Sequence, residues 1–237
     1  SANATPVKPI TPADTVDAAL SQAERIGYPV ALKASGGAGG RAIRRVTSPA
    51  DLEAAFGPVR RDAARVVSDR TMFVERWMPG MRHIEVQIQA DRHGTIWAIG
   101  TRDCSLQRRY QKLVSEAPAT GLSPELESAL LDAAVRLVAA AQYRDQVSVE
   151  FLVDLSGRFY FLEANTRLQV EHVVTELTSG IDLVKLEIDV ARGGYATTAT
   201  VAQTLMGRQR FTGTDSPLWQ GAYGDGRIGP HSGAGRA

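Results

Sequence analysis

The sequence is poor in several features that would mark a specialised class of protein. Its one cysteine, Cys104, excludes an internal disulfide framework and a zinc site built from cysteines. Neither sign of charge predominates, since 27 Lys and Arg stand against 26 Asp and Glu, so the whole chain does not attract nucleic acid or acidic membranes. No apolar run approaches the roughly 20 residues that span a bilayer, and the first residues lack the charged region and the apolar region of a signal peptide. We therefore expect a cytoplasmic protein, or one of an organelle matrix if a targeting segment has been removed, with neither nucleic acid nor membrane as a partner.

What remains is the composition of an ordinary globular protein. The 237 residues are 43% hydrophobic and 22% charged, which is enough to bury a sizeable core. Glycine is concentrated in residues 193–237, which hold ten of the 22 glycines and show neither helix nor strand periodicity. We predict that this segment is poorly ordered or depends on a partner surface.

The periodicity of the apolar residues predicts an α+β fold. Apolar spacing and end signals predict helices at 12–26, from 49 with an interruption near 57–58, and at 124–141. Alternation and turn signals predict strands at 29–33, 71–78, 82–90, 95–101, 147–153 and 158–163. The strand at 82–90 alternates strictly, so that one of its faces is apolar and the other carries His83, Glu85, Gln87 and Gln89.

A lysine and a glycine-rich loop follow each other early in the chain. The strand at 29–33 delivers Lys33 to the loop 35–41. Glycines let backbone N–H groups approach phosphate oxygens closely, and a nearby lysine adds positive charge. The loop matches neither the P-loop pattern nor the dinucleotide fingerprint, so phosphate binding and a plain flexible turn stay open as interpretations.

Two glutamates of one predicted hairpin form a candidate metal site. Glu150 and Glu163 lie near positions that face each other across the turn 154–157, and Asn165 follows on the same side of the strand as Glu163. Two carboxylates and an amide oxygen are hard ligands suited to Mg²⁺ or Mn²⁺. The alternative is a pair of solvated strand glutamates, although like charges held this close favour a cation between them.

The segment 102–112 is predicted to be a basic loop and contains Tyr110. RNA binding is one interpretation, but Asp103 interrupts the run and the chain is nearly neutral, which favours anion binding within an active site. His83 is either a structural histidine or a ligand contact. Cys104 is predicted to be a packed side chain rather than a nucleophile.

Four motifs occur in order along the chain, at 33–41, 82–87, 102–112 and 161–172. Together they resemble the ATP-grasp region of biotin carboxylase, which is found alone or within acetyl-CoA, propionyl-CoA, methylcrotonyl-CoA, pyruvate and urea carboxylases. The resemblance extends from about Pro6 to Arg192. It implies an α+β ATP-grasp fold with a small glycine-lid subdomain and a larger antiparallel-sheet subdomain. We accordingly expect an ATP-grasp domain at 5–192, with the lid at about 28–79, followed by a tail at 193–237 that does not match the family.

The resemblance also implies roles for individual residues. Those implied in ATP binding are Lys33, Gly39, Gly40, Glu75, Arg76, Trp77, Met78, His83, Gln107 and Tyr110. Those implied in holding bicarbonate or biotin are Arg167, Gln169, Val170 and Glu171. The implied catalytic residues are Arg167, Glu171 as the general base, and Lys112. The implied ligands of two Mg²⁺ or Mn²⁺ ions are Glu150, Glu163 and Asn165, and Tyr110 departs from the family's usual histidine.

The implied activity is that of a ligase, the ATP-dependent carboxylation of biotin with bicarbonate through carboxyphosphate. The chain has no Met-Lys-Met biotin-attachment segment, so biotin is expected on another domain or chain, together with a carboxyltransferase partner. Two alternatives stay open: another ATP-grasp ligase such as a carbamoyl phosphate synthetase-like unit, and a non-catalytic or weakly active nucleotide-binding fragment. Because the family's regions before Pro6 and after Arg192 are not identifiable, we expect the isolated chain to be incomplete and poorly active.

Overall fold

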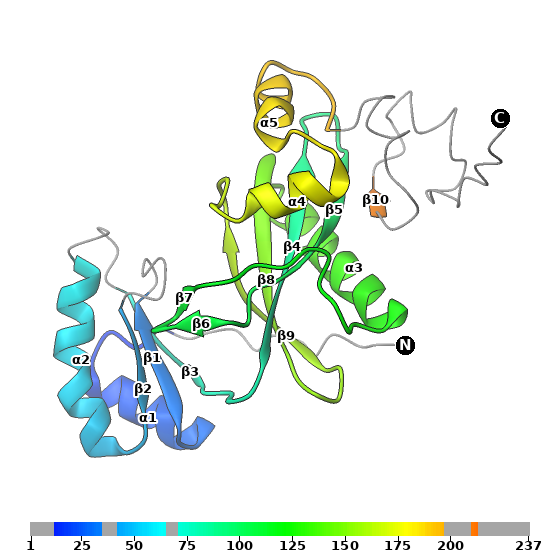
Figure 1. The fold of residues 1–237 in the computed structure, drawn as a ribbon. Coiled ribbons are helices and arrows are strands. Elements are labelled where there is room, and N and C mark those ends of the chain that lie inside the picture. Colours follow the sequence, from blue (N-terminus) through cyan, green and yellow to red (C-terminus); the bar gives the residue numbers. More distant parts are fainter. Residues whose placement is uncertain (1–11, 35–41, 65–70, 197–209, 213–237) are drawn as a thin grey trace, which may run out of the picture. The chain divides into compact units, whose positions relative to one another are not determined.

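The computed structural model describes residues 12–34, 42–64, 71–196 and 210–212 (Figure 1). Contacts divide the chain into two compact units. Of the described residues, the smaller unit contains 12–34, 42–64, 71–80 and 107–113, and the larger unit contains 81–106, 114–196 and 210–212. The segment 107–113 therefore belongs to the smaller unit, although in the sequence it lies between segments of the larger one.

The smaller unit is an antiparallel sheet packed against two helices. Its strands pair in the order β2-β1-β3, with β1 at Val30–Ala34, β2 at Ile43–Val46 and β3 at Met72–Arg76. Side chains of α1 (Val16–Ile26) and α2 (Pro49–Ala64) join the strands in one buried apolar cluster. A two-stranded hairpin, β6 (Gln107–Arg108) with β7 (Gln111–Lys112), completes the unit.

Helix α1 begins later than the sequence suggested. The predicted start at Pro12 is wrong, because the backbone N–H of Ala13 donates to the carbonyl of Met72 at 2.7 Å and holds this stretch against β3. Thr15 caps the helix instead, since its hydroxyl accepts a hydrogen bond from the N–H of Ala18 at 3.2 Å. The predicted end at Gly27 is confirmed, and its φ of +86° is a conformation that glycine adopts without strain.

Helix α2 is continuous, so the predicted interruption near Gly57 and Pro58 is wrong. Pro58 lies on the exposed side of the helix, and Ala54, whose carbonyl loses its helical donor there, is also exposed. Water can satisfy that carbonyl, while the opposite side of the helix buries Phe56 and Val59 in the apolar cluster. Packing therefore outweighs the local cost of the proline.

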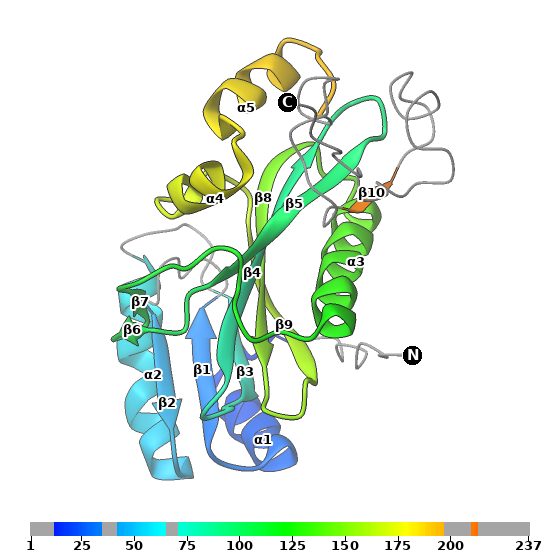
Figure 2. The same ribbon diagram turned by 45° about the vertical axis from the view of Figure 1, so that its right-hand side comes forward.

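The larger unit is a five-stranded antiparallel sheet with helices on both faces. Its strands pair in the order β10-β5-β4-β8-β9. Their bounds are Arg82–Ala90 for β4, Ile96–Asp103 for β5, Asp145–Val153 for β8, Phe159–Asn165 for β9 and Arg210–Thr212 for β10. Helix α3 (Pro124–Ala140) covers one face, and α4 (His172–Ser179) and α5 (Leu183–Ala191) lie on the other (Figure 2). The predicted α+β class is confirmed, as is the start of α3, which Ser123 caps.

The polar face of β4 is not a solvent face. Its predicted alternation is confirmed, and Ile84, Val86 and Ile88 pack with α3 in the main apolar cluster. Yet Glu85, Gln87 and Gln89 are each at most 1% exposed, because the opposite face of the sheet is also covered. Arg102 lies on that face too, as a fully buried residue of β5, so the prediction that it belongs to an anion-binding loop is wrong.

The beginning of the glycine-rich segment packs onto the larger unit. Ala196 is fully buried, and its N–H donates to the carboxylate of Asp91 at 2.8 Å. The prediction of poor order is therefore wrong for residues 193–196, and the remaining residues of that segment, apart from 210–212, lie outside the described part of the chain. Among the described helices, none has the length and apolarity needed to cross a bilayer.

Candidate active site

A row of charged residues crosses the sheet of the larger unit. Arg102 on β5 pairs with Glu85 on β4, Glu85 pairs with Glu150 on β8, and Glu150 pairs with Glu163 on β9. Directly paired residues of neighbouring strands project from the same face of a sheet. The four side chains therefore lie side by side on the face that carries α4 and α5, and three of them are carboxylates.

Glu150 and Glu163 face each other as the sequence predicted, and Asn165 lies between their carboxylates. The amide nitrogen of Asn165 donates to Glu150 Oε1 at 2.8 Å and to Glu163 Oε1 at 3.1 Å. The oxygen and nitrogen of an amide exchange places on a half-turn of the group, so the same side chain can offer Oδ1 to a cation. Two carboxylates and an amide oxygen are the ligands that Mg²⁺ and Mn²⁺ prefer, so this donor set fits a divalent ion.

His83 binds the other side of Glu150. Its Nε2 lies 2.7 Å from Glu150 Oε2 and 3.4 Å from Glu85 Oε1. Burial alone would lower the pKa of His83, but the hydrogen bonds and charges of Glu150 and Glu85 outweigh it and raise the pKa from 6.5 to about 9. At neutral pH the imidazolium and Arg102 thus supply two positive charges against the three carboxylates of the row, which leaves the site attractive to a cation.

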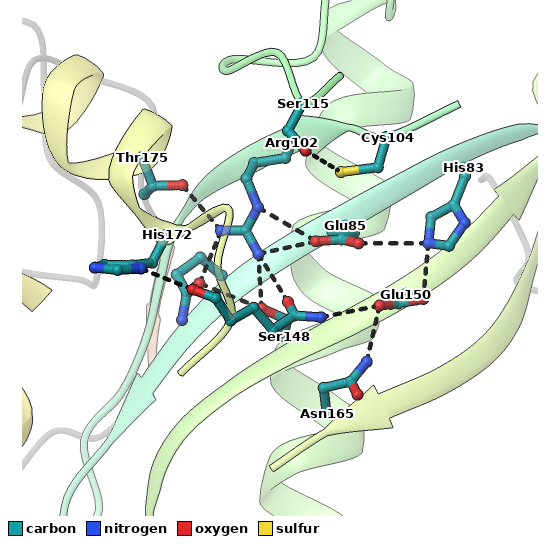
Figure 3. A network of polar contacts seen from close by, with 12 residues as sticks. His83, Glu85, Arg102, Cys104, Ser115, Ser148, Glu150, Asn165, His172 and Thr175 are labelled. Atoms are coloured by element: carbon teal, nitrogen blue, oxygen red, sulfur yellow. Dashed lines mark hydrogen bonds and ion pairs between the residues drawn. The ribbon is translucent and has the colours of Figure 1, made fainter. Parts of the chain in front are cut away.

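Figure 3 shows Arg102, Glu85 and Glu150 of the row from close by. Gln169 connects the row to the loop before α4. Its amide nitrogen donates to Glu150 Oε1 at 3.2 Å, and its amide oxygen accepts from Arg102 Nη2 at 3.1 Å. His172, the first residue of α4, places both its backbone N–H and its ring Nδ1 within hydrogen-bond distance of the Gln169 carbonyl, at 3.2 and 2.7 Å. Gln169 is 6% exposed, so the structure places it among the buried charges rather than at the surface.

The neighbours of Gln169 point elsewhere. Val170 is 90% exposed, and Arg167 donates to the carbonyl of Leu168 at 3.3 Å from an exposed position. Glu171 stands at the N-terminal end of α4, and one of its carboxylate oxygens lies within 4.8 Å of ligand atoms of Glu85 and Cys104. The loop thus brings Gln169 and Glu171 to the row of charges, whereas Arg167 and Val170 face solvent.

The smaller unit holds the other predicted residues. Lys33 Nζ lies 2.7 Å from Glu75 Oε1, because Lys33 on β1 pairs with Phe73 on β3 and Glu75 is the diagonal neighbour on the same face. Arg76 donates to the carbonyl of Ile26 at 2.9 Å, which fixes the end of β3 to the end of α1. Met78 continues this segment, and Gly39 and Gly40 lie outside the described residues.

Three predicted residues share the hairpin β6–β7. Gln107 and Lys112 are cross-strand partners, so both side chains project from the same face. Tyr110 occupies the turn with a φ of +63°, and its ring contacts that of Trp77 edge to face, with centroids 5.9 Å apart. The hairpin is therefore held against the segment that follows β3.

Sequence reasoning missed the buried partners of the site. Arg102 was assigned to a loop, and neither Thr175 nor Ser148 was singled out, although both contact the Arg102 guanidinium at 2.9 and 2.7 Å. The available signal was the unbroken polar alternation of 83–89, since a strand whose two faces are both covered must pair its polar residues internally. Cys104 is buried as predicted and lies 3.3 Å from the hydroxyl of Ser115.

Comparisons with known proteins agree on one family. A sequence model described as "Carbamoyl-phosphate synthase L chain, ATP binding domain" matches residues 2–197. The chloroplastic biotin carboxylase 2 of Populus trichocarpa is 44% identical over 179 residues, which are 76% of this chain and 34% of that protein. Pyruvate carboxylase 1 of Caenorhabditis elegans is 45% identical over 182 residues, which are 77% of this chain and 16% of that protein.

Solved structures show the same relationship. The biotin carboxylase of Campylobacter jejuni, crystallised as a β,γ-ATP complex, is 41% identical with a TM-score of 0.78, covering 87% of this chain and 46% of that one. A biotin carboxylase domain of the 2-oxoglutarate carboxylase of Hydrogenobacter thermophilus, in complex with MgADP, ADP and bicarbonate, is 35% identical with a TM-score of 0.76. It covers 86% of this chain and 45% of that one. The chain thus spans less than half the length of each of these relatives.

Proposed function

The chain belongs to the family of carbamoyl-phosphate synthase L-chain ATP-binding domains and has the ATP-grasp fold of biotin carboxylases, and we propose that it serves in the ATP-dependent carboxylation of biotin. Bicarbonate would be the carbon source and carboxyphosphate the intermediate. The observation that carries the proposal is the paired Glu150 and Glu163 with Asn165 between them, next to the loop that brings Gln169 and Glu171 to the same face. Relatives that share this fold are biotin carboxylases and biotin-dependent carboxylases, which supports the assignment.

The proposed domain is 5–192, with a lid subdomain at about 28–79 and a separate tail from 193. The division of contacts at Gly80 supports a distinct N-terminal lobe. That lobe carries Lys33 beside Glu75, together with Arg76, Trp77 and Met78 of the proposed adenine-binding segment. In this proposal Lys33 exchanges its partner Glu75 for ATP phosphates, and Gln107 and Lys112 present their side chains from one face of the hairpin.

Glu150, Glu163 and Asn165 would hold the divalent cation that accompanies ATP, with a second ion as a further element of the proposal. Such an ion neutralises phosphate charge and orients the phosphates. His83 binds Glu150 Oε2 at 2.7 Å and so keeps that carboxylate from turning away, while the second oxygen, Oε1, receives hydrogen bonds from the amides of Asn165 and Gln169. These contacts give the carboxylate a fixed orientation before any ligand binds.

The loop before α4 would bind bicarbonate. Glu171 would remove the proton of bicarbonate, since a carboxylate within reach of the substrate is a suitable general base. The guanidinium of Arg167 is exposed and can turn to the anions that form, and Gln169 and the backbone N–H of Val170 would hold the substrate by hydrogen bonds. Biotin would arrive on a carrier domain, and a carboxyltransferase would use the carboxylated product.

A second candidate is a nucleotide-binding role without turnover. Tyr110 favours it, because its ring is engaged with Trp77 instead of supplying the cation of the family's usual histidine. The two candidates differ in one measurable respect: only the first requires bicarbonate-dependent hydrolysis of ATP.

The experiment is a pair of assays on the same preparation. Titration calorimetry with ADP, with and without Mg²⁺, tests the nucleotide site, and phosphate release with ATP, bicarbonate and free biotin tests the reaction. Magnesium-dependent binding with bicarbonate-dependent phosphate release supports carboxylation. Binding with no response to bicarbonate supports the second candidate, and absence of nucleotide binding refutes both.

A further inference from the structure

Arg102 is buried more completely than its charge leads one to expect. Its side chain is 0% exposed and lies on the face of the five-stranded sheet that carries α4. All of its N–H groups have acceptors: Nε and Nη2 bind Glu85 Oε2 at 3.2 and 2.9 Å, and Nη1 binds Gln87 and Thr175 at 2.8 and 2.9 Å. The Nη2 group also binds Ser148 and Gln169, at 2.7 and 3.1 Å.

Stability alone is a poor explanation for this arrangement. Burying an ion pair costs desolvation energy, and replacing such a pair by apolar side chains is often neutral or stabilising. The rest of this face shows that uncharged packing is available, because Trp97 and Ile99 on the same strand form an apolar cluster with Leu183 and Leu186 of α5. The guanidinium therefore calls for a role that an apolar side chain could not fill.

That role follows from the direction of the hydrogen bonds. A guanidinium only donates, so the atom of Gln169 that faces Arg102 must be the amide oxygen. The amide nitrogen of Gln169 is then directed at Glu150 Oε1, 3.2 Å away. Glu150 only accepts and Arg102 only donates, so both favour this orientation of the amide, and Arg102 is the partner that holds its oxygen.

Arg102 also holds the segment around Gln169 through a second contact, with Thr175 of α4. Thr175, on the first turns of α4, accepts from Nη1, while Gln169, before α4, accepts from Nη2. Val170 and Glu171 lie between these two anchors in the sequence. One guanidinium on β5 thus ties both ends of the segment 169–175 to the sheet.

We propose that Arg102 is a positioning residue, which orients the Gln169 amide and anchors the segment 169–175 so that Val170 and Glu171 are presented to bicarbonate in a fixed place. The inference rests on the proposed function, in which this segment binds bicarbonate. It adds a residue that touches neither substrate nor metal and acts through Gln169 and Thr175.

Arg102→Lys is the most informative variant. Lysine keeps the positive charge beside Glu85, but its single nitrogen cannot reach Glu85, Gln169 and Thr175 together from one place. The double variant Arg102→Met with Glu85→Gln removes both charges, so that folding does not suffer from an unpaired buried charge. The matched control is Gln146→Met, which removes a buried amide of β8 that donates to the carbonyl of Leu183 and therefore anchors α5 instead of the segment 169–175.

The first readout needs no ligand. In NMR spectra of the ¹⁵N-labelled chain, the side-chain NH₂ signal of Gln169, assigned by its loss in Gln169→Glu, reports the hydrogen bond to Glu150. We expect this signal to move to the position of a free amide in Arg102→Lys and in the double variant, and to stay in place in Gln146→Met. Thermal unfolding of all variants shows that each is folded.

The second readout is kinetic. We expect KM for bicarbonate to rise at least about tenfold in Arg102→Lys and in the double variant, with magnesium-dependent ADP affinity within about threefold of the parent. An unchanged Gln169 signal in Arg102→Lys would overturn the proposal, and so would a double variant that regains the parent's signal and KM, because Arg102 would then serve only to neutralise Glu85. If the parent chain shows no bicarbonate-dependent turnover, the proposed function fails, and the Gln169 signal still decides whether Arg102 sets the orientation of that amide.

Discussion

Replacing Glu163 by glutamine tests the proposed metal site most directly, because the change removes one charge and almost no volume. Glu163 and Glu150 are directly opposed on β9 and β8, and the amide nitrogen of Asn165 already contacts both carboxylates, at 3.1 and 2.8 Å. Glutamine can still accept the hydrogen bond of Asn165. The variant should therefore fold as the parent does, with one fewer charge at the site.

The size of the effect follows from Coulomb's law. For a divalent ion roughly 3 Å from a carboxylate charge, the interaction is about 3 kcal/mol even at the dielectric constant of water, which corresponds to roughly 100-fold in affinity. Without metal the sign reverses, because opposed like charges destabilise a sheet by a few tenths of a kcal/mol to about 1 kcal/mol. We expect Glu163→Gln to raise the melting temperature of the metal-free chain slightly and to abolish most of the stabilisation by Mg²⁺.

Titration calorimetry with ADP, at fixed pH and salt and with or without Mg²⁺, measures the affinity. The control is Glu125→Gln, which removes a carboxylate from the exposed first turn of α3. We expect the affinity for MgADP to fall by about two orders of magnitude in Glu163→Gln, on the estimate above, and that for metal-free ADP to change little. Equal affinities for MgADP in variant and parent would show that Glu163 does not hold the ion.

Three further predictions concern other parts of the chain. Burial raises the pKa of Asp103, but hydrogen bonds from Ser105 and Arg82 outweigh this effect, so the pKa in the folded chain lies below 3.8. The ionised carboxylate therefore stabilises the fold above pH 3.8, and this stabilisation is lost as the pH falls through the folded-state pKa. The melting temperature of Asp103→Asn should therefore lie below that of the parent at pH 7 and converge with it as the pH falls through the lowered pKa of Asp103, whereas a constant gap would contradict the argument. Leu130→Ala, at a fully buried site on α3, should lower the free energy of unfolding by about 3 kcal/mol in urea titrations, and a loss below about 1 kcal/mol would mean that the core collapses around the change. Tyr110→Ala should cost about 1 kcal/mol and alter the tryptophan fluorescence through Trp77, while Tyr110→Phe should retain both the stability and the spectrum.

Local patterns were sufficient for much of the larger unit. The strict alternation of β4 predicted its bounds, and Ser123 with Pro124 predicted the start of α3, because period and cap are properties of a short segment. The same kind of signal predicted the wrong start for α1 and an interruption of α2 at Pro58 that the structure does not have. In both cases a contact with a distant part of the chain, with Met72 or with the apolar cluster, outweighed the local preference.

Register was decided by the tertiary structure. At the hairpin turn, Ala90 of β4 pairs with Ile96 of β5. If the pairing of the two strands continued from there without interruption, Thr101 would lie opposite Glu85. An irregularity between Gln87 and Ile88 shifts the pairing by one residue and brings Arg102 to Glu85. A second shift, between Glu150 and Phe151, brings Glu163 to Glu150, where an uninterrupted hairpin would place Leu162.

The sequence by itself determined which residues are proposed to carry the chemistry, since carboxylates, an amide and basic side chains in these motifs imply a cation site and an anion site wherever they meet. That Glu150 and Glu163 lie near facing positions could be predicted within one hairpin, because the turn between them is short, but the register shift is what places them directly opposite each other. Only the tertiary structure placed Arg102 beside Glu85, Gln169 and Thr175, which are 17, 67 and 73 residues away along the chain. The physical reason is that a β-bulge and the covering of the second face by α4 depend on packing across the whole sheet, and no short segment encodes either of them.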